Sequence, residues 1–446
     1  MAMSVVVALL SWFAVAAQQA PPPAGVPIGS EKFALRVVTT GLAGPWEARL
    51  GPDGMLWVTE RVGKRITRVN PADGTKTIVV TIPDVMQTVS QDGLLGLALH
   101  PDFGMNRGAD YLYAAMTYDA DPGAGETRRM KIRRYTWDAK GSRLGSPMDV
   151  IDNLPAGVDH LSGRLAIGPD RKLYITLGDG GVNQFTVWCQ PIQAQVVPTA
   201  ADVASKNWPK VYQGKILRIN LDGSIPVDNP VIAGVRSHIY SYGHRNSQGL
   251  GFGPDGKLYA SEHGPSVDDE LNLIQAGKNY GWPHVAGYRD DKAYTYQNWS
   301  AAPNCASLTW DAIVAPPSVP AAKETSWTSA DFVPPIQTFF TVAADYDFKT
   351  GNATIAPSGT VVYSARPGIP GWANSVLVTS LIRGVVYRVK LNAAGTAVEG
   401  GPLAYFQAAD RYRDLEIAPD GKTIYAATDS NSTAHKGAIL AFTYQP

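Results

Sequence analysis

The stretch 252-FGPDGKLYASEHG-264 places a Pro-Asp-Gly turn directly before an alternating run of residues that is typical of a β-strand. The same unit recurs in variants that begin at Leu50, His100, Ile167, Ala356 and Ala418. Six copies of one strand-pair unit predict six four-stranded blades around a central channel. We therefore expect an all-β fold, a six-bladed β-propeller whose long inter-strand loops form the active-site face.

The composition favours the same fold class. Of the 446 residues, 45% are hydrophobic and 17% are charged, and the chain contains 44 glycines and 33 prolines, which indicates a turn-rich protein with a substantial core. Basic and acidic residues number 39 each, without a basic stripe, which argues against a nucleic-acid partner. A β-sandwich, or two domains of short strands, is the alternative fold, but the repeat continues from Leu50 to the C-terminus without a linker.

The N-terminal region does not follow the repeat. An apolar run from Val5 to Ala17 is too short to span a bilayer and precedes a Pro-rich stretch. This pattern predicts a signal peptide over residues 1–17, a Pro-rich segment over 18–34 and a single propeller domain over 35–446. A buried N-terminal helix is the alternative, because no Lys or Arg precedes the run. We expect a periplasmic or secreted protein with no stable membrane span.

The two cysteines, Cys189 and Cys305, lie far apart and outside any metal-ligand spacing. In an exported protein they could form a disulfide, and two free thiols fit the sequence equally well. Neither interpretation supports a zinc site or a cysteine nucleophile.

Unusual polar residues occur in the loops that flank the repeated strands. Loops at one end of a propeller converge on its axis, so residues far apart in the sequence can share a pocket. Taken singly, each residue has an ordinary explanation, since a loop His beside an Asp or an Arg in a strand is usually structural. One such motif per blade favours a site. The set contains Gln91, Asp159, His160, Asp179, Gln184, Arg245, Asn246, Gly264, Pro265, Arg411 and Arg413.

These residue types suit proton abstraction beside an anionic ligand. Carboxylates beside His160 would orient its ring and favour the imidazolium that forms when it takes a proton, which suits a general base. One arginine can stabilise an oxyanion, and three arginines suit a polyanionic ligand. Carbonyl groups at the turn formed by Gly264 and Pro265, next to acidic residues, are suitable ligands for Ca²⁺. The combination fits alcohol oxidation on an anionic quinone, and it also fits calcium-assisted hydrolysis.

Five segments resemble the soluble PQQ-dependent glucose dehydrogenases and the related aldose sugar dehydrogenases, in order and in wording. They are 159-DHLSGRLAIGPD-170, 221-LDGSIPVDNP-230, 237-SHIYSYGHRNSQGL-250, 279-NYGWPHVAGYRDD-291 and 410-DRYRDLEIAPDG-421. The resemblance covers residues 35–446. It implies a propeller enzyme that oxidises the C1 hydroxyl of an aldose to the lactone with pyrroloquinoline quinone (PQQ) and Ca²⁺ as cofactors. It also implies an external electron acceptor and a homodimer.

The same resemblance implies a role for each residue of the set. His160 would take the proton of the C1 hydroxyl, Asp179 would orient His160, and Arg245 would stabilise charge on the quinone oxygen. The expected cofactor-binding residues are Asn246, Thr354, Arg411 and Arg413, and the expected sugar contacts are Gln91, Asp159 and Gln184. The carbonyl groups of Gly264 and Pro265 would bind one Ca²⁺. A second calcium site is expected at Ala286, Tyr288, Asp290 and Glu324.

Three departures from the family pattern concern the pocket. Ile382 replaces a lysine that contacts the cofactor, Leu161 replaces a polar residue after the histidine, and the shortened loop 346–354 lacks a tryptophan. They imply altered cofactor affinity and a substrate that can differ from glucose. Two alternatives remain: a calcium-dependent propeller hydrolase or lactonase, for which three arginines beside the cation are out of place, and a non-catalytic propeller that binds glycans or protein.

Overall fold

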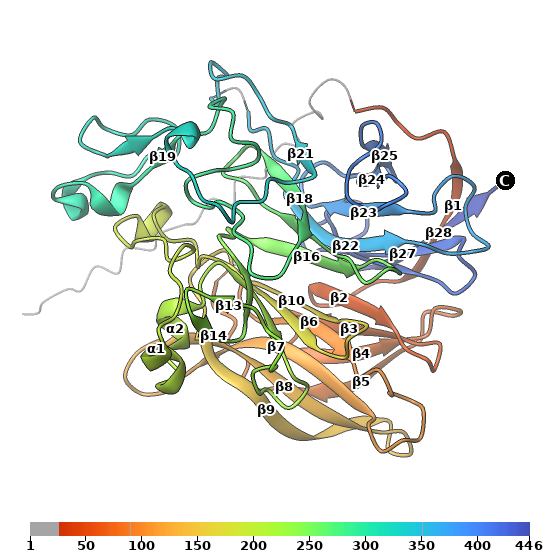
Figure 1. Ribbon diagram of the computed structural model, residues 1–446. Coiled ribbons are helices and arrows are strands. Elements are labelled where there is room, and N and C mark those ends of the chain that lie inside the picture. The colour runs from red at the N-terminus through yellow and green to blue at the C-terminus, as the bar shows by residue number, and fades with distance from the viewer. Residues whose placement is uncertain (1–25, 90, 350) are drawn as a thin grey trace, which may run out of the picture.

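The computed structural model describes residues 26–89, 91–349 and 351–446, and its regular structure is nearly all β-strand (Figure 1). The signal peptide predicted over residues 1–17 lies outside the described residues, as do residues 18–25 of the predicted segment 18–34. Among the residues described, no helix has the length and apolar character that crossing a membrane requires.

Three antiparallel four-stranded sheets follow one another in the first half of the chain. The first contains β2 (Pro45–Leu50), β3 (Leu56–Glu60), β4 (Arg65–Val69) and β5 (Lys76–Thr81). The second contains β6 (Leu94–Leu99), β7 (Tyr111–Asp119), β8 (Arg128–Asp138) and β9 (Arg143–Pro155). The third contains β10 (Ser162–Ile167), β11 (Leu173–Leu177), β12 (Lys215–Ile219) and β15 (Ile239–Tyr242).

Three more four-stranded sheets complete the set. The fourth contains β16 (Ser247–Phe252), β17 (Leu258–Glu262), β18 (Asp269–Ile274) and β21 (Gln337–Phe339). The fifth contains β22 (Pro357–Tyr363), β23 (Ser375–Ser380), β24 (Val386–Lys390) and β25 (Leu403–Tyr405). The sixth contains β26 (Tyr412–Ile417), β27 (Thr423–Thr428), β28 (Ile439–Gln445) and β1 (Lys32–Thr39).

The six sheets are blades arranged in a closed ring. The first strands of the blades, β2, β6, β10, β16, β22 and β26, each contact the first strand of the next blade, and β26 returns to β2. Strand β1 pairs antiparallel with β28, so the N-terminal strand completes the last blade. This closure leaves only short strand edges exposed. The predicted six-bladed β-propeller is confirmed, with its first strand beginning at Lys32, ahead of residue 35.

The Pro-Asp-Gly turns join the first and second strands of their blades. In the first blade Gly51 N–H donates to the Met55 carbonyl at 2.8 Å, and Gly54 adopts a φ of +73°, which favours glycine. All inner strands run in the same sense around the channel, so these turns lie at one mouth. The residues that precede each inner strand, and those that follow each second strand, lie at the opposite mouth, which we call the site mouth.

The copy at Ala356 was wrongly interpreted as a turn. Residues Pro357–Tyr363 form the inner strand β22 itself. Gly359 is needed there because a Cβ atom would lie 2.5 Å from Asp414 Oδ1, and Ser358 Oγ donates to the Arg413 carbonyl at 2.7 Å. Close packing between two inner strands therefore explains this Pro-Ser-Gly sequence, while the turn of the blade is the longer segment 364–374.

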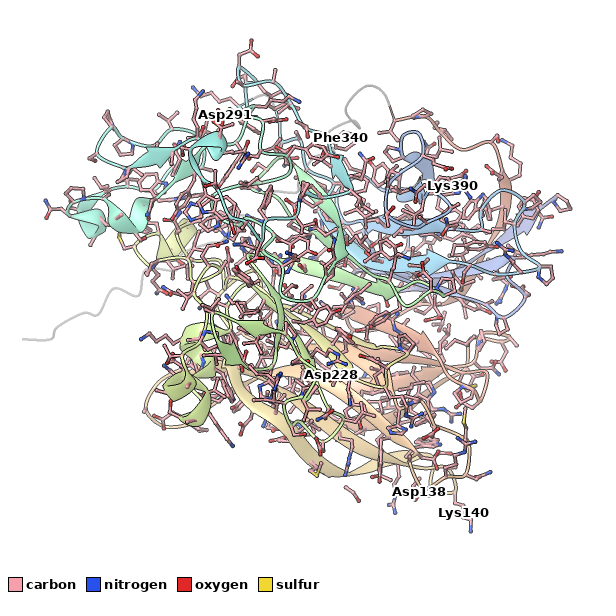
Figure 2. All side chains as sticks on the ribbon, in the orientation of Figure 1. Asp138, Lys140, Asp228, Asp291, Phe340 and Lys390 are labelled. Carbon is pink, nitrogen blue, oxygen red and sulfur yellow. A yellow bond between two sulfur atoms is a disulfide. The ribbon has the colours of Figure 1, made fainter. Side chains whose placement is uncertain are left out.

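Buried apolar clusters fill the space between the blades, and side chains cover the whole ribbon (Figure 2). The inner strands carry buried charges as well. Arg164 is fully buried, and its Nη1 lies 3.0 Å from Asp414 Oδ1 and 3.6 Å from Glu47 Oε2. Its guanidinium group also stacks over Trp46, 4.2 Å from the ring centre. Breaking such a buried pair by removing one partner is strongly destabilising, so these groups fix the inner strands relative to one another.

Shorter elements lie in the long connections between strands. Between β11 and β12 are η1 (Phe185–Val187), α1 (Ala200–Ala204) and α2 (Trp208–Val211). Between β12 and β15 is the hairpin of β13 (Val231–Ile232) and β14 (Val235–Arg236). Between β18 and β21, the long insertion contains β19 (Tyr296–Gln297), η2 (Trp299–Ala301), η3 (Cys305–Ser307), β20 (Ala321–Ala322) and η4 (Glu324–Ser326).

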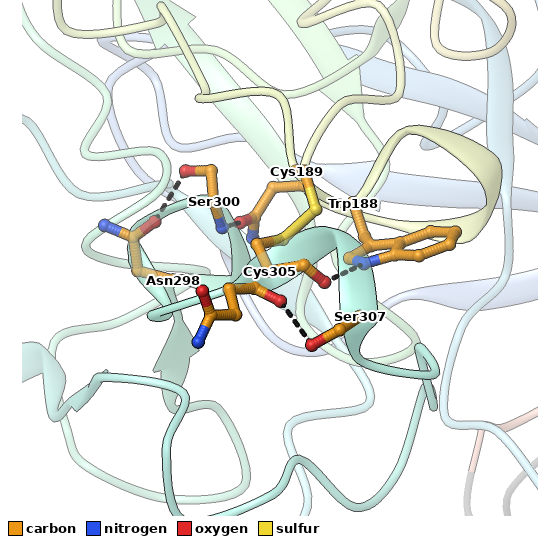
Figure 3. The surroundings of a disulfide bond; sticks show 8 residues. Trp188, Cys189, Asn298, Ser300, Cys305 and Ser307 are labelled. Carbon is orange, nitrogen blue, oxygen red and sulfur yellow. Dashed lines mark hydrogen bonds between the residues drawn. A yellow bond between two sulfur atoms is a disulfide. The ribbon is translucent and has the colours of Figure 1, made fainter.

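Cys189 and Cys305 form a disulfide, which decides between the two alternatives left open by the sequence (Figure 3). The bond joins the η1 connection to the insertion between β18 and β21, across 116 residues of sequence. Trp188 Nε1–H donates to the Cys305 carbonyl at 3.1 Å, so a hydrogen bond accompanies the covalent link.

Stability should fall in acid because of His238, which packs on Trp208 and Tyr212 with 5% of its surface exposed. Burial lowers the pKa of His238 to about 4, whereas the unfolded chain binds this proton below its ordinary pKa of about 6.5. The free energy of unfolding should therefore fall by about 3 kcal/mol as the pH drops from above 6.5 to below 4. Denaturant unfolding of the wild type and His238→Gln at pH 7 and pH 4 checks this, since an equal acid loss in the variant would contradict it.

Candidate active site

The polar residues singled out from the sequence come from equivalent positions at the site mouth. Gln91, Asp159, His160, Arg245, Asn246 and Thr354 precede inner strands, Arg411 and Arg413 lie at the start of β26, and Asp179, Gln184, Gly264 and Pro265 follow second strands. The blade repeat therefore explains why residues of five blades converge on one region.

His160 and Asp179 form a buried pair. His160 Nδ1 lies 2.7 Å from Asp179 Oδ1, and the two residues are 5% and 1% exposed. Because the Asp179 carboxylate accepts, Nδ1–H is the donor and Nε2 is the accepting nitrogen, which the Gln184 amide N–H contacts here and which could take a substrate proton when that contact is displaced. The backbone is adapted to this placement, since His160 has a φ of +45° and a Cβ atom on Gly178 would lie 1.8 Å from the His160 carbonyl oxygen.

Asp159 and Gln184 lie around Nε2 of the imidazole, and the Gln184 amide N–H donates to it. Gln184 Nε2 is 3.1 Å from His160 Nε2, and Asp159 Oδ2 is 4.0 Å from the same atom. Asp159 Oδ1 also accepts from the His160 backbone N–H at 2.8 Å. A hydroxyl group that approaches His160 therefore meets an amide and a carboxylate, which suits the recognition of a polyol.

Arg245 is placed beside this pair by Trp282. The Trp282 indole N–H donates to Asp179 Oδ2 at 2.8 Å, and the Arg245 guanidinium group lies 5.3 Å from the centre of the Trp282 ring. Arg245 Nη1 donates to the His263 carbonyl at 3.2 Å, while the Arg245 backbone N–H donates to the Glu262 carboxylate. The guanidinium group is thus held from several sides, which pre-organises it to stabilise negative charge.

Arg413 is fixed by a buried ion pair. Its Nη2 lies 2.6 Å from Asp429 Oδ2, and its Nη1 donates to Gln248 Oε1 at 2.8 Å. Burial opposes ionisation of Asp429, but Arg413 and Arg411 keep the pKa of this carboxyl well below its ordinary value. Gln248 Nε2 in turn donates to Gln91 Oε1 at 3.3 Å, which links the arginine to the expected sugar-binding residue.

Arg411 and Asn246 carry buried polar atoms that the fold does not use. Arg411 Nη1 donates to the Leu381 carbonyl at 2.9 Å, and Asn246 Oδ1 accepts from Ser162 N–H and Oγ–H at 3.2 and 3.1 Å. Within the described chain, Arg245 Nε, Asn246 Nδ2 and Arg411 Nε are buried without a hydrogen-bond partner. Buried donors are normally satisfied, so these three donors at the site mouth are available to a ligand or to water.

Thr354 and Gly264 meet at Asp269. The Asp269 carboxylate accepts from the Thr354 hydroxyl and from the Gly264 N–H, the latter at 2.8 Å. Burial raises the pKa of Asp269 to about 6. Arg383, which follows Ile382, donates from Nε to the Thr354 carbonyl at 2.8 Å. This hydrogen bond holds the end of the shortened loop in position.

The expected second calcium site is organised around Glu324, which is 1% exposed. Its carboxylate accepts from the backbone N–H groups of Ala286, Asp290 and Asp291 at 3.0, 3.3 and 3.0 Å, while the Tyr288 side chain in the same loop is exposed. Burial raises the pKa of Glu324 to about 7. Across the described residues, no group of three or more His, Cys, Asp or Glu side chains is arranged to hold a metal ion.

Several functional partners could not be identified from the sequence. Trp282, Gln248, Asp429 and Glu262 connect residues of the predicted set, yet each lies in another blade or loop from its partner. His263 was also missed. It donates from Nε2 to the Pro357 carbonyl at 2.6 Å, and burial, with the nearby charges of Arg245 and His160, keeps its pKa well below the ordinary value. The positions of Gln248 and Trp282 in the quoted segments 237–250 and 279–291, and of Glu262 and His263 in the quoted repeat 252–264, were the signals that the sequence offered.

Replacing Asp179 with Asn should lower kcat for alcohol oxidation on the order of 10²-fold. The amide has nearly the same shape, but it no longer requires the proton on Nδ1, so His160 can present Nε2–H to the substrate and lose its basic lone pair. Steady-state kinetics from pH 6 to 9 check this. An unchanged kcat across this range would show that the carboxylate does not set the tautomer.

A family model described as glucose / sorbosone dehydrogenase matches residues 42–337 and 340–440. The chain belongs to the glucose / sorbosone dehydrogenase family. Quinoprotein glucose dehydrogenase B of Acinetobacter calcoaceticus is 41% identical over 443 residues, which cover 93% of this chain and 92% of that protein. The family predicted from the five quoted segments is therefore confirmed, and members of this family are oxidoreductases that act on sugars.

Solved structures agree with this assignment. The PQQ-bound form of an aldose sugar dehydrogenase from Streptomyces coelicolor is 28% identical with a TM-score of 0.66, over 94% of this chain and 100% of that chain. The apo form of the soluble aldose sugar dehydrogenase from Escherichia coli is 26% identical with a TM-score of 0.67, over 93% of this chain and 100% of that chain. The family fold thus spans nearly the whole length of the chain.

Proposed function

We propose that this protein is a PQQ-dependent aldose dehydrogenase, which oxidises the C1 hydroxyl of an aldose to the lactone. The observation that carries the proposal is the pairing of His160 with Asp179 next to Arg245, at a mouth that also contains Arg411 and Arg413. Membership of the glucose / sorbosone dehydrogenase family supports it, as does the PQQ-bound state of the related Streptomyces coelicolor enzyme.

The donor set fits an anionic quinone. Arg245, Asn246 and Arg411 each have a buried N–H donor without a hydrogen-bond partner. Carboxylate and carbonyl oxygens of a ligand would accept hydrogen bonds from these donors. PQQ carries both kinds of oxygen, and when bound it supplies a quinone that accepts a hydride. We propose that Arg411 and Arg413 hold its acidic side, with Asn246 and Thr354 beside it. Three guanidinium groups fit such a ligand better than the catalytic Ca²⁺ of a hydrolase or lactonase.

His160 acts as the general base in this proposal. Its Nε2 takes the proton of the C1 hydroxyl while Asp179 keeps Nδ1 protonated and the ring oriented. Gln184 and Asp159, both near Nε2, orient the sugar hydroxyl groups, and Gln91 contacts the sugar from another blade. Arg245 would stabilise the negative charge that develops on the quinone oxygen when the hydride leaves C1.

Calcium is proposed at two places. The carbonyl groups of Gly264 and Pro265 would bind the Ca²⁺ next to the cofactor, in a turn that the bond from Gly264 N–H to Asp269 holds in position. The second ion would use Ala286, Tyr288, Asp290 and Glu324. The Glu324 carboxylate accepts hydrogen bonds from backbone N–H groups of this loop.

Export to the periplasm or the medium is also proposed. The disulfide between Cys189 and Cys305 supports it, because disulfides persist in oxidising compartments. Electrons would pass to an external acceptor. The homodimer rests on the family resemblance alone.

Reconstitution tests the proposed function. Adding PQQ and Ca²⁺ to the purified protein should yield sugar-dependent reduction of an electron-accepting dye with at least one of a panel of aldoses. Omitting PQQ, or removing Ca²⁺ with a chelator, should abolish the activity. Absence of dye reduction with every aldose, together with no binding of PQQ by absorbance, would refute the proposal, and lactone turnover without PQQ would favour a lactonase.

A further inference from the structure

A cavity of about 310 Å³ opens on the axis of the propeller, at the mouth opposite the site mouth. All six blades line it, because its lining residues lie in the inner strands, most of them at the ends that lead into the Pro-Asp-Gly turns. We call it the turn-mouth cavity. None of its described lining residues belongs to the site mouth, and its volume is within the range of small-molecule pockets.

Small residues leave the space for this cavity. Ala98, Ala166 and Gly251 occupy the penultimate positions of the inner strands β6, β10 and β16. The same position is Arg49 in β2 and Glu416 in β26. Among the described residues that line the cavity, these two alone are charged.

The wall around the charged pair is largely apolar. Leu50, Leu99, Ile167 and Phe252 end four of the inner strands, line the cavity and are half-buried. Their apolar surface is thus partly open to water inside a concave site. Covering it with the apolar part of a ligand would be favourable.

The charges next to the cavity do not balance. Glu47 and Asp414 each lie within ion-pair distance of both Arg49 and Arg164, so these four groups neutralise one another. Glu416 is a third carboxylate, and no further arginine or lysine lies within ion-pair distance of it in the described chain. The inner strands therefore carry one negative charge in excess at the wall of the cavity.

Arg49 does not supply the missing cation. Its Nη1 lies 3.7 Å from Glu416 Oε2, beyond hydrogen-bond distance, and donates to Asp414 Oδ2 at 3.2 Å and to the Ala48 carbonyl at 3.0 Å. Burial raises the pKa of Glu416 to about 7 against the opposing effect of Arg49, and the charges of Asp414 and Glu47 add to the rise. A cation in the cavity would relieve this repulsion.

We propose that the turn-mouth cavity binds a small protonated amine that carries an unbranched apolar chain. The ammonium group pairs with Glu416, and the chain lies against the apolar ends of the inner strands. An anion is disfavoured, because Arg49 Nη1 and Nη2 already contact Asp414 and Glu47. The site is separate from the sugar site, so the proposal does not depend on the proposed function.

Three six-carbon probes test the charge and the chain separately. In calorimetry at pH 8.5, without sugar, n-hexylammonium should bind the purified protein about tenfold more tightly than hexanol, which lacks the charge, or hexanoate, which reverses it. Saturating PQQ should leave the affinity unchanged. No binding of hexylammonium, equal binding of hexanol or hexanoate, or displacement of the amine by PQQ would overturn the proposal.

Glu416→Gln removes the charge and keeps the size of the side chain. The affinity for hexylammonium should fall about tenfold, and that for hexanol should stay the same. The matched control is Glu399→Gln, because Glu399 is an exposed carboxylate in the connection between β24 and β25 and should not affect either probe. Wild-type affinity for hexylammonium in Glu416→Gln would contradict the proposed pairing.

The pH dependence tests the same pairing in the wild type. Besides Arg49 and Glu47 on β2 and Asp414 on its own strand, the strands packed against β26, namely β22, β23 and β27, bring no charged residue to Glu416. With a pKa of about 7, only about a tenth of Glu416 is ionised at pH 6, so the affinity for hexylammonium should be about tenfold lower than at pH 8.5. Equal affinity at the two pH values would refute the proposal.

Discussion

Replacing His160 with Ala should lower kcat/KM for aldose oxidation by about 10²–10⁴-fold, the range expected when a general base is lost. The imidazole is the group whose Nε2 lies next to Gln184 while Asp179 holds the other nitrogen, and alanine leaves no proton acceptor at the position of Nε2. The measurement is steady-state dye reduction by protein reconstituted with PQQ and Ca²⁺.

The variant must still bind its cofactor if His160 acts only as the base. His160→Ala should bind PQQ with wild-type affinity by absorbance titration, because the proposed cofactor contacts are Arg411, Arg413, Asn246 and Thr354. His100→Ala is the matched control, since His100 lies in the turn after β6 at the mouth opposite the site and should leave kcat/KM unchanged. A His160→Ala variant with wild-type kcat/KM would rule out this residue as the base.

Replacing Arg413 with Met should reduce both stability and cofactor affinity. The change leaves the Asp429 carboxylate, which is 5% exposed, without the cation that lies 2.6 Å away, and removing one partner of a buried ion pair costs about 3–5 kcal/mol. The Kd for PQQ should rise about 10²-fold, because a charged donor to the cofactor is lost. Denaturant unfolding and absorbance titration measure the two effects separately.

A second substitution separates these two roles of Arg413. Adding Asp429→Asn to Arg413→Met removes the unpaired charge while keeping an acceptor for the Asn431 N–H, which donates to Asp429 Oδ1 at 2.9 Å. The double variant should recover most of the lost stability and none of the PQQ affinity. Recovery of PQQ affinity together with stability would mean that Arg413 acts only as a structural residue.

The architecture could be predicted because turn chemistry is local. A Pro-Asp-Gly turn before a β-branched or alternating strand identifies the junction of the first two strands in a blade, as at Gly51 and Gly253. The segment from Ala356 was misleading because Pro and Gly also occur where two strands pack closely together, and not only in turns. Gly359 is required by the neighbouring inner strand, and that requirement comes from packing between blades, which local sequence does not express.

The site was predictable as a set of residues but not as a network. His160 and Asp179 could be paired through the family resemblance, whereas the indole of Trp282 joins Asp179 to Arg245 through a contact 103 residues away in sequence. The contact from Gln248 to Gln91 likewise forms only when blades meet, and the ion pair of Arg413 with Asp429 joins a strand to the loop after the next strand of the same blade. Spacing along one strand carries no information about such contacts.

The position of the insertion between β18 and β21 was unpredictable for a different reason. Trp299 and Trp310, which lie in this insertion, gave no sign in the sequence that they lie near Gln184 of the catalytic loop. The disulfide of Cys189 and Cys305 establishes this placement, and the two cysteines by themselves were equally compatible with free thiols. Tertiary contacts between two irregular segments decided the outcome.

A single-turnover experiment tests the role of His160 in sugar oxidation most directly. Protein loaded with PQQ and Ca²⁺ is mixed with excess aldose under anaerobic conditions and without dye, and the quinone absorbance and the lactone are measured together. We predict loss of the quinone absorbance with one equivalent of lactone per PQQ in the wild type, and neither change at a comparable rate in His160→Ala. Lactone formation without a change in the quinone, or a wild-type rate in His160→Ala, would contradict this mechanism.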